Sequence, residues 1–164
     1  MRLRVVAFAV LVAALSLASS FLPATVAAKA PVSKTGVTYL PTVPLTIETA
    51  SGTRQLQIEV ARTSAEQERG LMYRHSLPKD GGMIFPMEPV RVATFWMKNT
   101  LIPLDMVFIR TDGTIARITT AKALSLDIDD SGEPVGAVLE LAGGKAAALG
   151  IAVNDHVTWQ DVGR

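Results

Sequence analysis

The sequence contains no cysteine among its 164 residues. This absence excludes disulfide bonds, thiol catalysis and cysteine-based zinc sites. Small domains that lack a large core often depend on disulfides, so this chain must instead be stabilised by its own apolar core. A single domain of roughly 120 residues can supply such a core.

A dominant charge of one sign is also lacking. Lys and Arg together number 16, Asp and Glu together number 15, and the two signs are interspersed along the chain. A balanced charge gives no reason to expect nucleic acid or a membrane surface as a partner. Catalytic motifs of defined pattern are missing too: there is no Gly-rich phosphate loop with its lysine, no HExxH and no nucleophile elbow. Two histidines leave little for a catalytic triad.

An apolar N-terminal run predicts export. Two arginines precede the uncharged residues 5–22, Pro23 ends the run, and small residues continue to Ala28. This order predicts a signal peptide over residues 1–28 and therefore a periplasmic or secreted protein, with no membrane contact after cleavage. The alternative is a retained membrane anchor, because the run approaches the roughly 18 residues of a spanning helix. The small residues favour cleavage, and the lack of a cysteine after them argues against a lipoprotein.

One domain is predicted after the signal. Residues 29–42 are short of large apolar side chains and are expected to form a flexible lead-in, and the folded domain takes residues 43–164. Alternating apolar and polar residues predict a hairpin of strands 45–49 and 56–60. Further strands are predicted over residues 83–87, 92–99, 104–110, 115–119, 135–141 and 156–159, with a tight turn at Asp112-Gly113 and a polar loop over residues 127–134.

One substantial helix is predicted, beginning at Thr63 or Ser64 with a capping box and running to about His75. Gly70 within it costs about 1 kcal/mol against alanine, which indicates close packing against a strand or a ligand. A short helix is expected over residues 144–149. Many short strands with few helices predict a mainly β fold, either a β-sandwich or a partly closed β-barrel, with one main helix and a short C-terminal helix.

The end of an aromatic strand carries the first candidate binding residues. The period of two in residues 92–99 places Trp96 and Lys98 on one face of the strand and Asn99 on the other. A cation and an amide at this strand end, shortly before Pro103, lie where loops gather and sites usually form. The alternative is that Lys98 is a solvated charge and Asn99 a turn residue.

Arginine and aspartate residues supply the other candidates. Arg69 and Arg74 are five residues apart, which separates them by about 140° around a helix, so the two are not expected to face one ligand. Asp105 lies within an apolar run and needs a partner, for which Lys98, Arg69 or Arg74 are candidates. Such a pair is structural by default. The catalytic interpretation makes Asp105, or Asp80, a general acid or base.

Five methionines raise the question of a metal site. Thioether sulfur with an imidazole, here His75, suits Cu(I). The residues are not clustered in the sequence, and methionine more often fills gaps in cores, so neither a metal nor another cofactor is predicted. His156, within an apolar strand, is expected to be a buried core residue. The methionines are Met72, Met83, Met87, Met97 and Met106.

Three runs of the sequence, Glu68–Arg74, Gly82–Phe85 and Phe95–Met106, resemble the DUF192 family (domain of unknown function 192). The similarity extends to Asp112-Gly113 and to the closing segment, so it covers nearly all of residues 43–164. It implies a β-rich, sandwich-like fold and, in many members, an export signal, but no activity. One departure is Asn154, where the family commonly has glycine. The positions that match the family signature are Arg69, Gly70, Met72, Arg74, Met83, Phe85, Phe95, Trp96, Met97, Lys98, Asn99, Pro103 and Asp105.

Three functional hypotheses follow. The first is a periplasmic binding or interaction module for a small polar or anionic ligand, held by Arg69, Trp96, Lys98, Asn99 and Asp105. The second is a cell-envelope hydrolase with a carboxylate base, either Asp105 or Asp80, in which Lys98 or Asn99 stabilises developing negative charge. The third is a structural component of the envelope. The first is preferred because the sequence shows no recognisable nucleophile.

Overall fold

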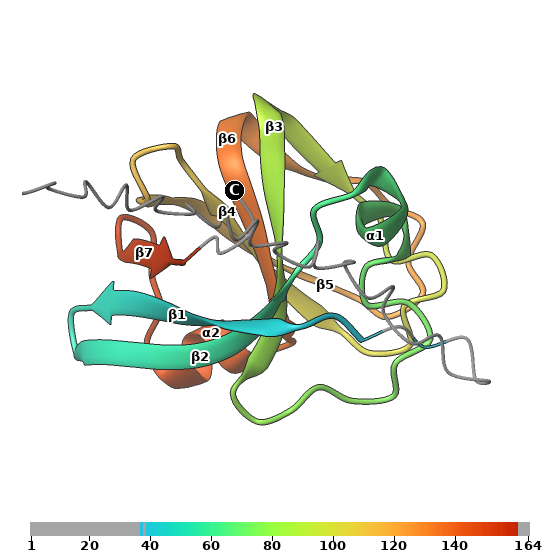
Figure 1. Ribbon diagram of the computed structural model, residues 1–164, viewed down its shortest axis with the longest axis horizontal. Helices are drawn as coiled ribbons and strands as arrows, with labels where there is room; N and C mark the ends of the chain where they lie inside the picture. Colours follow the sequence, from blue (N-terminus) through green and yellow to red (C-terminus); the bar gives the residue numbers. More distant parts are fainter. Residues whose placement is uncertain (1–36, 38, 161–164) are drawn as a thin grey trace, which may run out of the picture.

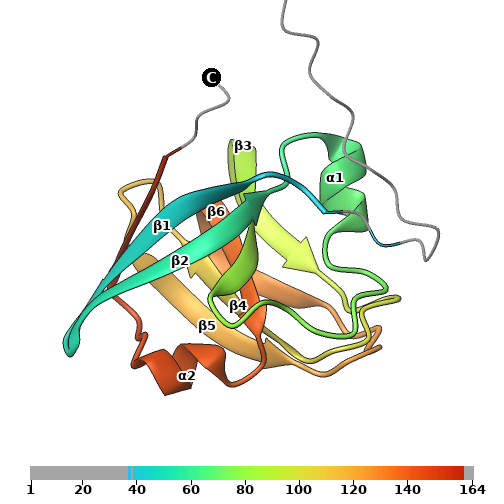
Figure 2. The same cartoon turned by 60° about the horizontal axis from the view of Figure 1, so that its bottom comes forward.

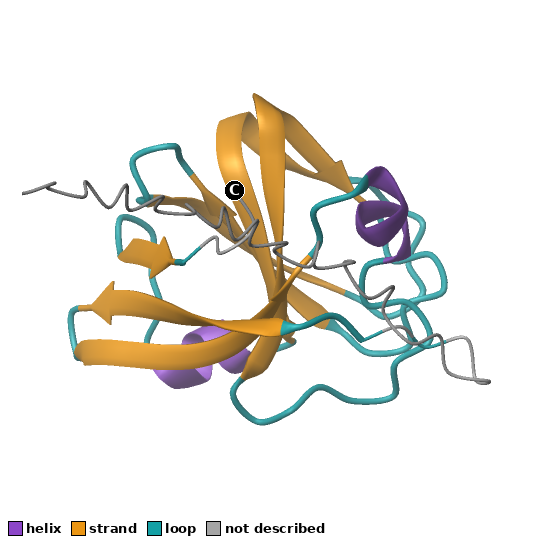
Figure 3. Cartoon of the chain, in the orientation of Figure 1, coloured by secondary structure: helices purple, strands orange, loops and turns teal. Residues whose placement is uncertain are grey.

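The computed structural model describes residue 37 and residues 39–160 (Figure 1). The predicted signal peptide and most of the predicted lead-in lie outside these residues. Over the described part of the chain, no helix is long and apolar enough to cross a membrane. Strands dominate there and two short helices accompany them (Figure 3), which confirms the predicted mainly β fold.

The strands form one sheet, in which every neighbouring pair is antiparallel except a single parallel pair. In chain order the elements of the described residues are β1 (Thr42–Thr49), β2 (Gly52–Val60), α1 (Ser64–Arg69), β3 (Gly81–Phe95), β4 (Leu104–Ile109), β5 (Ile115–Ala121), β6 (Asp129–Ala142), α2 (Lys145–Leu149) and β7 (His156–Trp159). The strand order in the sheet is β5-β4-β6-β3-β2-β1-β7. The parallel pair is β2 and β3.

The two edges of the sheet approach each other. β7, at one edge, meets the turn before β5, at the other, through an isolated bridge between Thr114 and His156. The Val157 N–H donates a hydrogen bond to the Gly113 carbonyl oxygen at 2.8 Å. No ladder joins the two edge strands over the described residues, so the sheet curls into a barrel that stays open (Figures 1 and 2). This arrangement is consistent with the predicted β-sandwich or partly closed β-barrel.

The inside of the curled sheet is filled by an interior cluster of apolar side chains. Each of the seven strands contributes to it, and Ala146 of α2 and Ile151 pack against it. Fully burying one large aliphatic side chain contributes roughly 1.5–3 kcal/mol, so this cluster is a principal source of stability. Its members include Ile47, Ile58, Ile84, Val107 and Leu139, all with no exposed surface.

A second cluster covers the opposite face of the central strands. We call it the α1-side cluster; its members include Met83, Phe85, Met106, Phe108 and Val138. In Figure 2, α1 stands beside the end of β3 on this side of the sheet. Because both faces of the central strands are covered, all six residues of β4 are buried. Strands buried on both faces have nearly continuous apolar sequences, and a charged residue among them is therefore informative.

The helix α1 differs from the prediction at its C-terminal end. Its start is as expected: the Thr63 hydroxyl caps the Glu66 N–H, and the Glu66 carboxylate accepts from the Thr63 N–H at 2.8 Å. The helix ends at Arg69 rather than near His75, because Gly70 turns to a positive φ of 45°. Gly70 is the residue that terminates the helix, not a weak point within it.

Two predictions about strands and one about a buried histidine need correction. The runs 83–87 and 92–99 belong to one long bent strand, β3, which ends at Phe95, so Trp96 to Asn99 lie beyond the sheet. The predicted polar loop 127–134 is partly strand, because β6 begins at Asp129 and pairs with the end of β3. His156 is exposed rather than buried, and its Nε2 lies 2.9 Å from the Asp112 carbonyl oxygen.

Candidate functional site

A cavity of about 290 Å³ opens between α1, the residues that follow it and the second half of β3. This volume lies at the lower end of the range for small-molecule sites. The walls combine aromatic, thioether and aliphatic side chains with a few charged ones. The lining residues are Gln67, Glu68, Arg69, Gly70, Leu71, Met72, Phe85, Met87, Arg91, Ala93, Thr94, Phe95, Trp96, Thr100 and Glu140.

The buried side of this cavity is formed by Glu140 of β6. The strand register places Glu140 opposite Met83 of β3 and Met106 of β4, and it places Glu59 of β2 beside Met83. Because cross-strand neighbours project from the same face of a sheet, these four side chains form one row on the α1 side. Two carboxyl groups therefore lie within the α1-side cluster, separated by one methionine.

Glu140 is only 5% exposed. Burial raises its pKa from 4.5 to about 8, and the positive charge of Arg74 opposes this rise only in part. Among the described residues, no group forms a hydrogen bond with its carboxyl group. At neutral pH Glu140 therefore carries a proton and presents a neutral carboxylic acid to the cavity.

Arg74 ties the neighbouring glutamate to the chain that follows α1. Its Nη1 and Nη2 atoms donate to the two carboxylate oxygens of Glu59 at 2.5 and 2.8 Å, and the Leu40 N–H donates to Glu59 at 2.6 Å. The Arg74 guanidinium also lies 4.7 Å from the centre of the Tyr39 ring. Both charged side chains are buried. The charge of Arg74 is thus matched by Glu59, and Glu140 is left without a matching cation.

The backbone at Gly70 shapes the wall next to α1. A Cβ atom added at this position would lie 3.3 Å from Cζ of Phe85, and the positive φ is one that other residues rarely adopt. The Phe85 ring in turn makes an edge-to-face contact with Phe95, at 5.3 Å between ring centres. A glycine is therefore needed at position 70 because the chain packs closely against a strand there. This was one of the two explanations predicted for Gly70.

The solvent side of the cavity carries cations. Arg69 and Arg91 both line it, and in the described residues neither forms an ion pair with a carboxylate. The Arg69 guanidinium rests 4.9 Å from the centre of the Tyr73 ring. Glu68 is the acidic residue on this side, and it is exposed. The arrangement provides positive charge at the opening and a protonated acid at the buried end.

The residues predicted to bind ligand are only partly brought together. Arg69 and Trp96 both line the cavity. Lys98 stands beside it, with its Nζ atom 5.0 Å from the centre of the Trp96 ring. Asn99 does not line it; this residue has a left-handed φ of 59°, and its carbonyl oxygen accepts a hydrogen bond from the Tyr73 N–H at 2.8 Å. Asn99 is placed as a turn residue that holds the segment after α1 against the end of β3.

Asp105 lies away from the cavity, and the cationic partner expected for it is wrong. Its carboxylate accepts hydrogen bonds from the Thr120 hydroxyl at 2.7 Å and from the N–H groups of Gly144 and Ala146 at 3.0 and 2.8 Å. The carboxylate therefore fixes the first turn of α2 to β4. The other proposed base, Asp80, is exposed and lies 3.8 Å from the Lys145 Nζ atom.

Replacing Asp105 with asparagine is expected to destabilise the fold by about 2 kcal/mol, because an NH₂ group would then face a backbone N–H. Ligand binding in the cavity should be unchanged at temperatures where the variant is folded. Urea unfolding monitored by circular dichroism measures the first effect. A variant that keeps wild-type stability would contradict this structural role for Asp105.

The methionines gather in the α1-side cluster instead of forming an exposed site. Met83, Met87, Met97 and Met106 are buried there, and the Met72 sulfur accepts from the Asn99 side-chain amide at 3.8 Å. His75 is exposed. In the described part of the chain, no group of three or more His, Asp or Glu residues is placed to hold a metal ion. The methionines act as core residues that also form part of the cavity wall.

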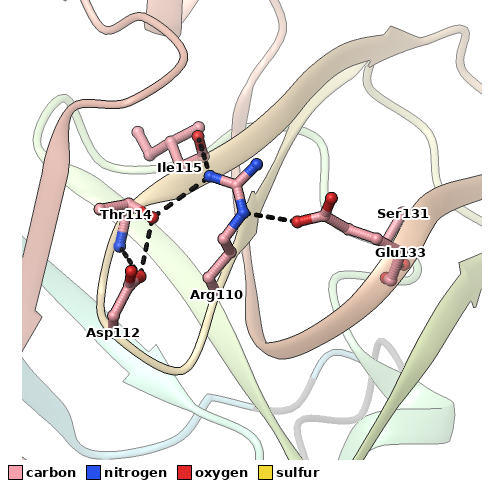
Figure 4. A network of polar contacts seen from close by, with 6 residues as sticks. All are labelled: Arg110, Asp112, Thr114, Ile115, Ser131 and Glu133. Carbon is pink, nitrogen blue, oxygen red and sulfur yellow. Dashed lines mark hydrogen bonds and ion pairs between the residues drawn. The ribbon is translucent and has the colours of Figure 1, made fainter.

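A second cavity, of about 510 Å³, lies between the bend of β3, the turn after β4 and β7. Its arginine, Arg110, is already engaged: Nε pairs with Glu133 at 2.5 Å, and Nη1 donates to Thr114 at 3.2 Å (Figure 4). Asp112 likewise accepts from the N–H and hydroxyl groups of Thr114. Arg110 and Asp112 thus have polar partners outside this cavity, whereas Arg69, Arg91 and Glu140 of the first cavity form no ion pair within the described residues.

Glu140, Arg91 and the pair of Glu59 with Arg74 were not identified as site residues from the sequence. The signal for Glu140 was present: it is the only charged residue in the run Val135 to Ala142. A strand with both faces buried has no solvent face for such a residue. Arg91, between Val90 and Val92, and Glu59, between Ile58 and Val60, alternate with apolar residues as polar residues on the solvent face of a strand do, so they give no comparable signal.

Comparison with known proteins places the chain among proteins of similar sequence and shape. The model of the DUF192 family, described as "Uncharacterized ACR", matches residues 46–159. A crystal structure from Sinorhizobium meliloti, whose description suggests a transcription regulator, is 41% identical, covers 76% of this chain and 98% of its own, and has a TM-score of 0.71. A protein of unknown function from Novosphingobium aromaticivorans is 42% identical, with coverages of 81% and 94% and a TM-score of 0.70. No curated protein matches the sequence.

Proposed function

We propose that this chain, which belongs to the DUF192 family, is an exported binding module which holds a small ligand in the cavity between α1 and β3, the α1–β3 cavity. The observation that carries the proposal is the Glu140 carboxyl group, which is buried, has no hydrogen-bond partner in the described residues and lines an open cavity. A neutral carboxylic acid in this position can donate one hydrogen bond and accept others. A polar ligand group that enters the cavity therefore finds a hydrogen-bond partner in Glu140.

The cavity walls support a ligand with an apolar body and a polar or anionic end. Phe85, Phe95 and Trp96 offer aromatic surface, and Met72 and Met87 offer thioether groups that adapt to different shapes. Trp96 is 47% exposed, so part of its ring is available to a ligand. Arg69 and Arg91 suit a carboxylate or phosphate at the opening.

A thermal melt against a panel of organic acids, phosphates, sugars and peptidoglycan fragments tests this function. A ligand at about 100 times its dissociation constant should stabilise the protein by roughly 2.7 kcal/mol. We expect Trp96→Ala and Arg69→Gln each to weaken binding about tenfold or more without loss of folding, since both side chains are partly exposed. Arg117→Gln, an exposed arginine on β5, is the matched control and should bind as the wild type does. Equal affinity in all three variants would place the ligand elsewhere.

We also propose that the protein is periplasmic or secreted. Support comes from the order of charged, apolar and small residues over 1–28. After expression in a Gram-negative host, the mature protein should be released by osmotic shock, and its N-terminal sequence should begin at Lys29. Retention in the membrane fraction with Met1 intact would support the anchor instead.

An enzymatic function is the second candidate, and one observation favours it. A carboxyl group that holds its proton at neutral pH is suited to act as a general acid. Such a hydrolase would use Glu140, because Asp105 and Asp80 do not line the cavity. Release of products from peptidoglycan fragments by the wild type, but not by Glu140→Gln, would establish it. We rank it second because the remaining acid of the cavity, Glu68, is exposed and because the described residues that line the cavity include no serine or histidine.

The description of the Sinorhizobium protein does not lead us to propose DNA binding. The two helices of the described residues, α1 and α2, have six and five residues. Reading the major groove with a helix usually takes a longer one. The nearly equal numbers of basic and acidic residues also give the chain little net positive charge to attract a phosphate backbone.

A further inference from the structure

The charges buried beneath the cavity do not balance when Glu140 is ionised. Glu59 accepts two hydrogen bonds from Arg74 and one from the Leu40 N–H, so its negative charge is fully compensated. Arg74 binds Glu59 through both Nη atoms, and its charge offsets the burial of Glu140 only in part. An ionised Glu140 would add one uncompensated negative charge in an apolar setting, which is too costly to keep.

Two states avoid an uncompensated charge on Glu140. In the empty cavity Glu140 keeps its proton. In the occupied cavity a ligand cation can replace that proton and form an ion pair with the carboxylate. The charged groups near Glu140 are Arg74, which acts on its pKa, and Glu59, which pairs with Arg74. Glu68 and Arg69 of α1 and Arg91 of β3 line the same cavity, and within the described residues none of the three cations forms an ion pair with Glu140. The deep end of the cavity is thus suited to an ammonium group.

The more exposed part of the cavity is suited to an anion. Arg69 and Arg91 line it, and neither forms an ion pair in the part of the chain that is described. The rings of Phe85, Phe95 and Trp96 line the same cavity and offer it an apolar surface. A ligand that uses both ends must carry opposite charges that are separated by an apolar body.

We infer that the ligand of this cavity is a zwitterion, an amino-carboxylate whose ammonium group pairs with Glu140 and whose carboxylate lies at Arg69 and Arg91. ω-Amino acids and short apolar peptides have this chemistry. The inference rests on the proposed binding function and adds the class of ligand. Binding is coupled to a proton: the ligand ammonium keeps its three protons, the Glu140 acid loses one, and that proton passes to solvent.

The experiment is isothermal titration calorimetry in two buffers of different ionisation enthalpy. The probes are 4-(aminomethyl)benzoate and a series of linear ω-amino acids of increasing length. Each is matched by the acid that lacks the amine and by the amine that lacks the carboxylate. We expect at least one zwitterion to bind tightest in its set, to release about 0.9 proton at pH 7, and to gain nearly tenfold in affinity from pH 6 to pH 7.

Two variants separate the parts of the inference. Glu140→Gln, which is nearly isosteric, should lose the proton release and the preference for the amine, and it should still bind the matched acid. Arg91→Gln should keep the proton release and lose the preference for the carboxylate. Glu48→Gln, an exposed glutamate of β1 that does not line the cavity, is the control variant, and it should behave as the wild type does.

The outcomes are distinguishable from a failure of the proposed function. If the acids bind as tightly as their zwitterions, or if a zwitterion binds without proton release, the inference is overturned while the binding module stands. If no zwitterion binds but a phosphate or sugar does, the inference is equally overturned. If no small molecule binds at all, the proposed function fails together with it.

Discussion

Arg74→Met is expected to lower the free energy of unfolding by about 3–5 kcal/mol. The substitution leaves the Glu59 carboxylate buried with only the Leu40 N–H as a partner. It also removes the positive charge that limits the rise in the pKa of Glu140. Methionine has a similar length and is apolar, so lost packing adds little. Urea unfolding followed by circular dichroism measures the effect.

The double variant Glu59→Gln/Arg74→Met separates the charge from the packing. Removing both charges should recover a large part of the lost stability, since neither variant residue needs a buried partner of opposite sign. Arg69→Met is the matched control, because Arg69 is partly exposed and forms no ion pair in the described residues. It should change stability by less than about 1 kcal/mol. If Arg74→Met is as harmless as this control, the buried pair does not stabilise the fold.

The second large effect concerns the pH dependence of stability. The pKa of Glu140 is about 8 in the folded protein and near 4.5 in an unfolded chain, because burial penalises its charged form. Between these values the folded state binds the proton that the unfolded state has released. Stability from this group is therefore greatest below about pH 4.5, falls as the pH rises through the window, and levels off above about pH 8.

Glu140→Gln should remove this trend. The difference in unfolding free energy between variant and wild type should grow in favour of the variant by on the order of 4 kcal/mol from pH 4.5 to pH 8. Other acids, such as Glu66 and Asp112, have pKa values lowered by hydrogen bonds, but they are common to both proteins and cancel in the difference. Chemical unfolding at several pH values measures it. A constant difference would mean that Glu140 titrates normally in the folded protein.

Local signals predicted the hairpins well. Asp112-Gly113 supplies the positive φ that the turn between β4 and β5 needs, with Gly113 at 86°. The alternation in residues 45–49 and 56–60 predicted β1 and β2, which pair from Thr49 opposite Gly52. In each case the residues that decide the structure are neighbours in the chain, so the local sequence is sufficient to predict the hairpin.

Long-range pairing explains what the sequence did not show. β3 continues from Gly81 to Phe95 past two prolines because β6 pairs along most of its length, and the shifts in register accommodate the prolines. Because of the same pairing, the acidic residues at the start of β6 adopt strand conformation. From local propensity, prolines and aspartates predict loops. The partner strand that overrides this propensity is some 45 residues away in the chain, so its effect is not visible locally.

The candidate site was also predictable only where it depends on local features of the sequence. Arg69 and Trp96 were identified because an arginine on a helix and a tryptophan at a strand end are visible as local features. Asp105 drew attention as a charge in an apolar run, and Glu140 met the same criterion without being singled out. Only the packing distinguishes them: the backbone of α2 satisfies Asp105, whereas an open cavity faces Glu140.

The two tryptophans of the chain allow the most direct test of the central claim, that the α1–β3 cavity holds a small ligand. Trp96 lines this cavity and Trp159 lines the second one. Each gives one indole N–H signal in a ¹H–¹⁵N NMR spectrum, and these can be assigned with Trp96→Phe. Titration with the zwitterions and their matched acids and amines should move the Trp96 signal and the Gly70 amide and leave the Trp159 signal in place. Movement of Trp159 alone, or of neither signal at saturating ligand, would contradict the account.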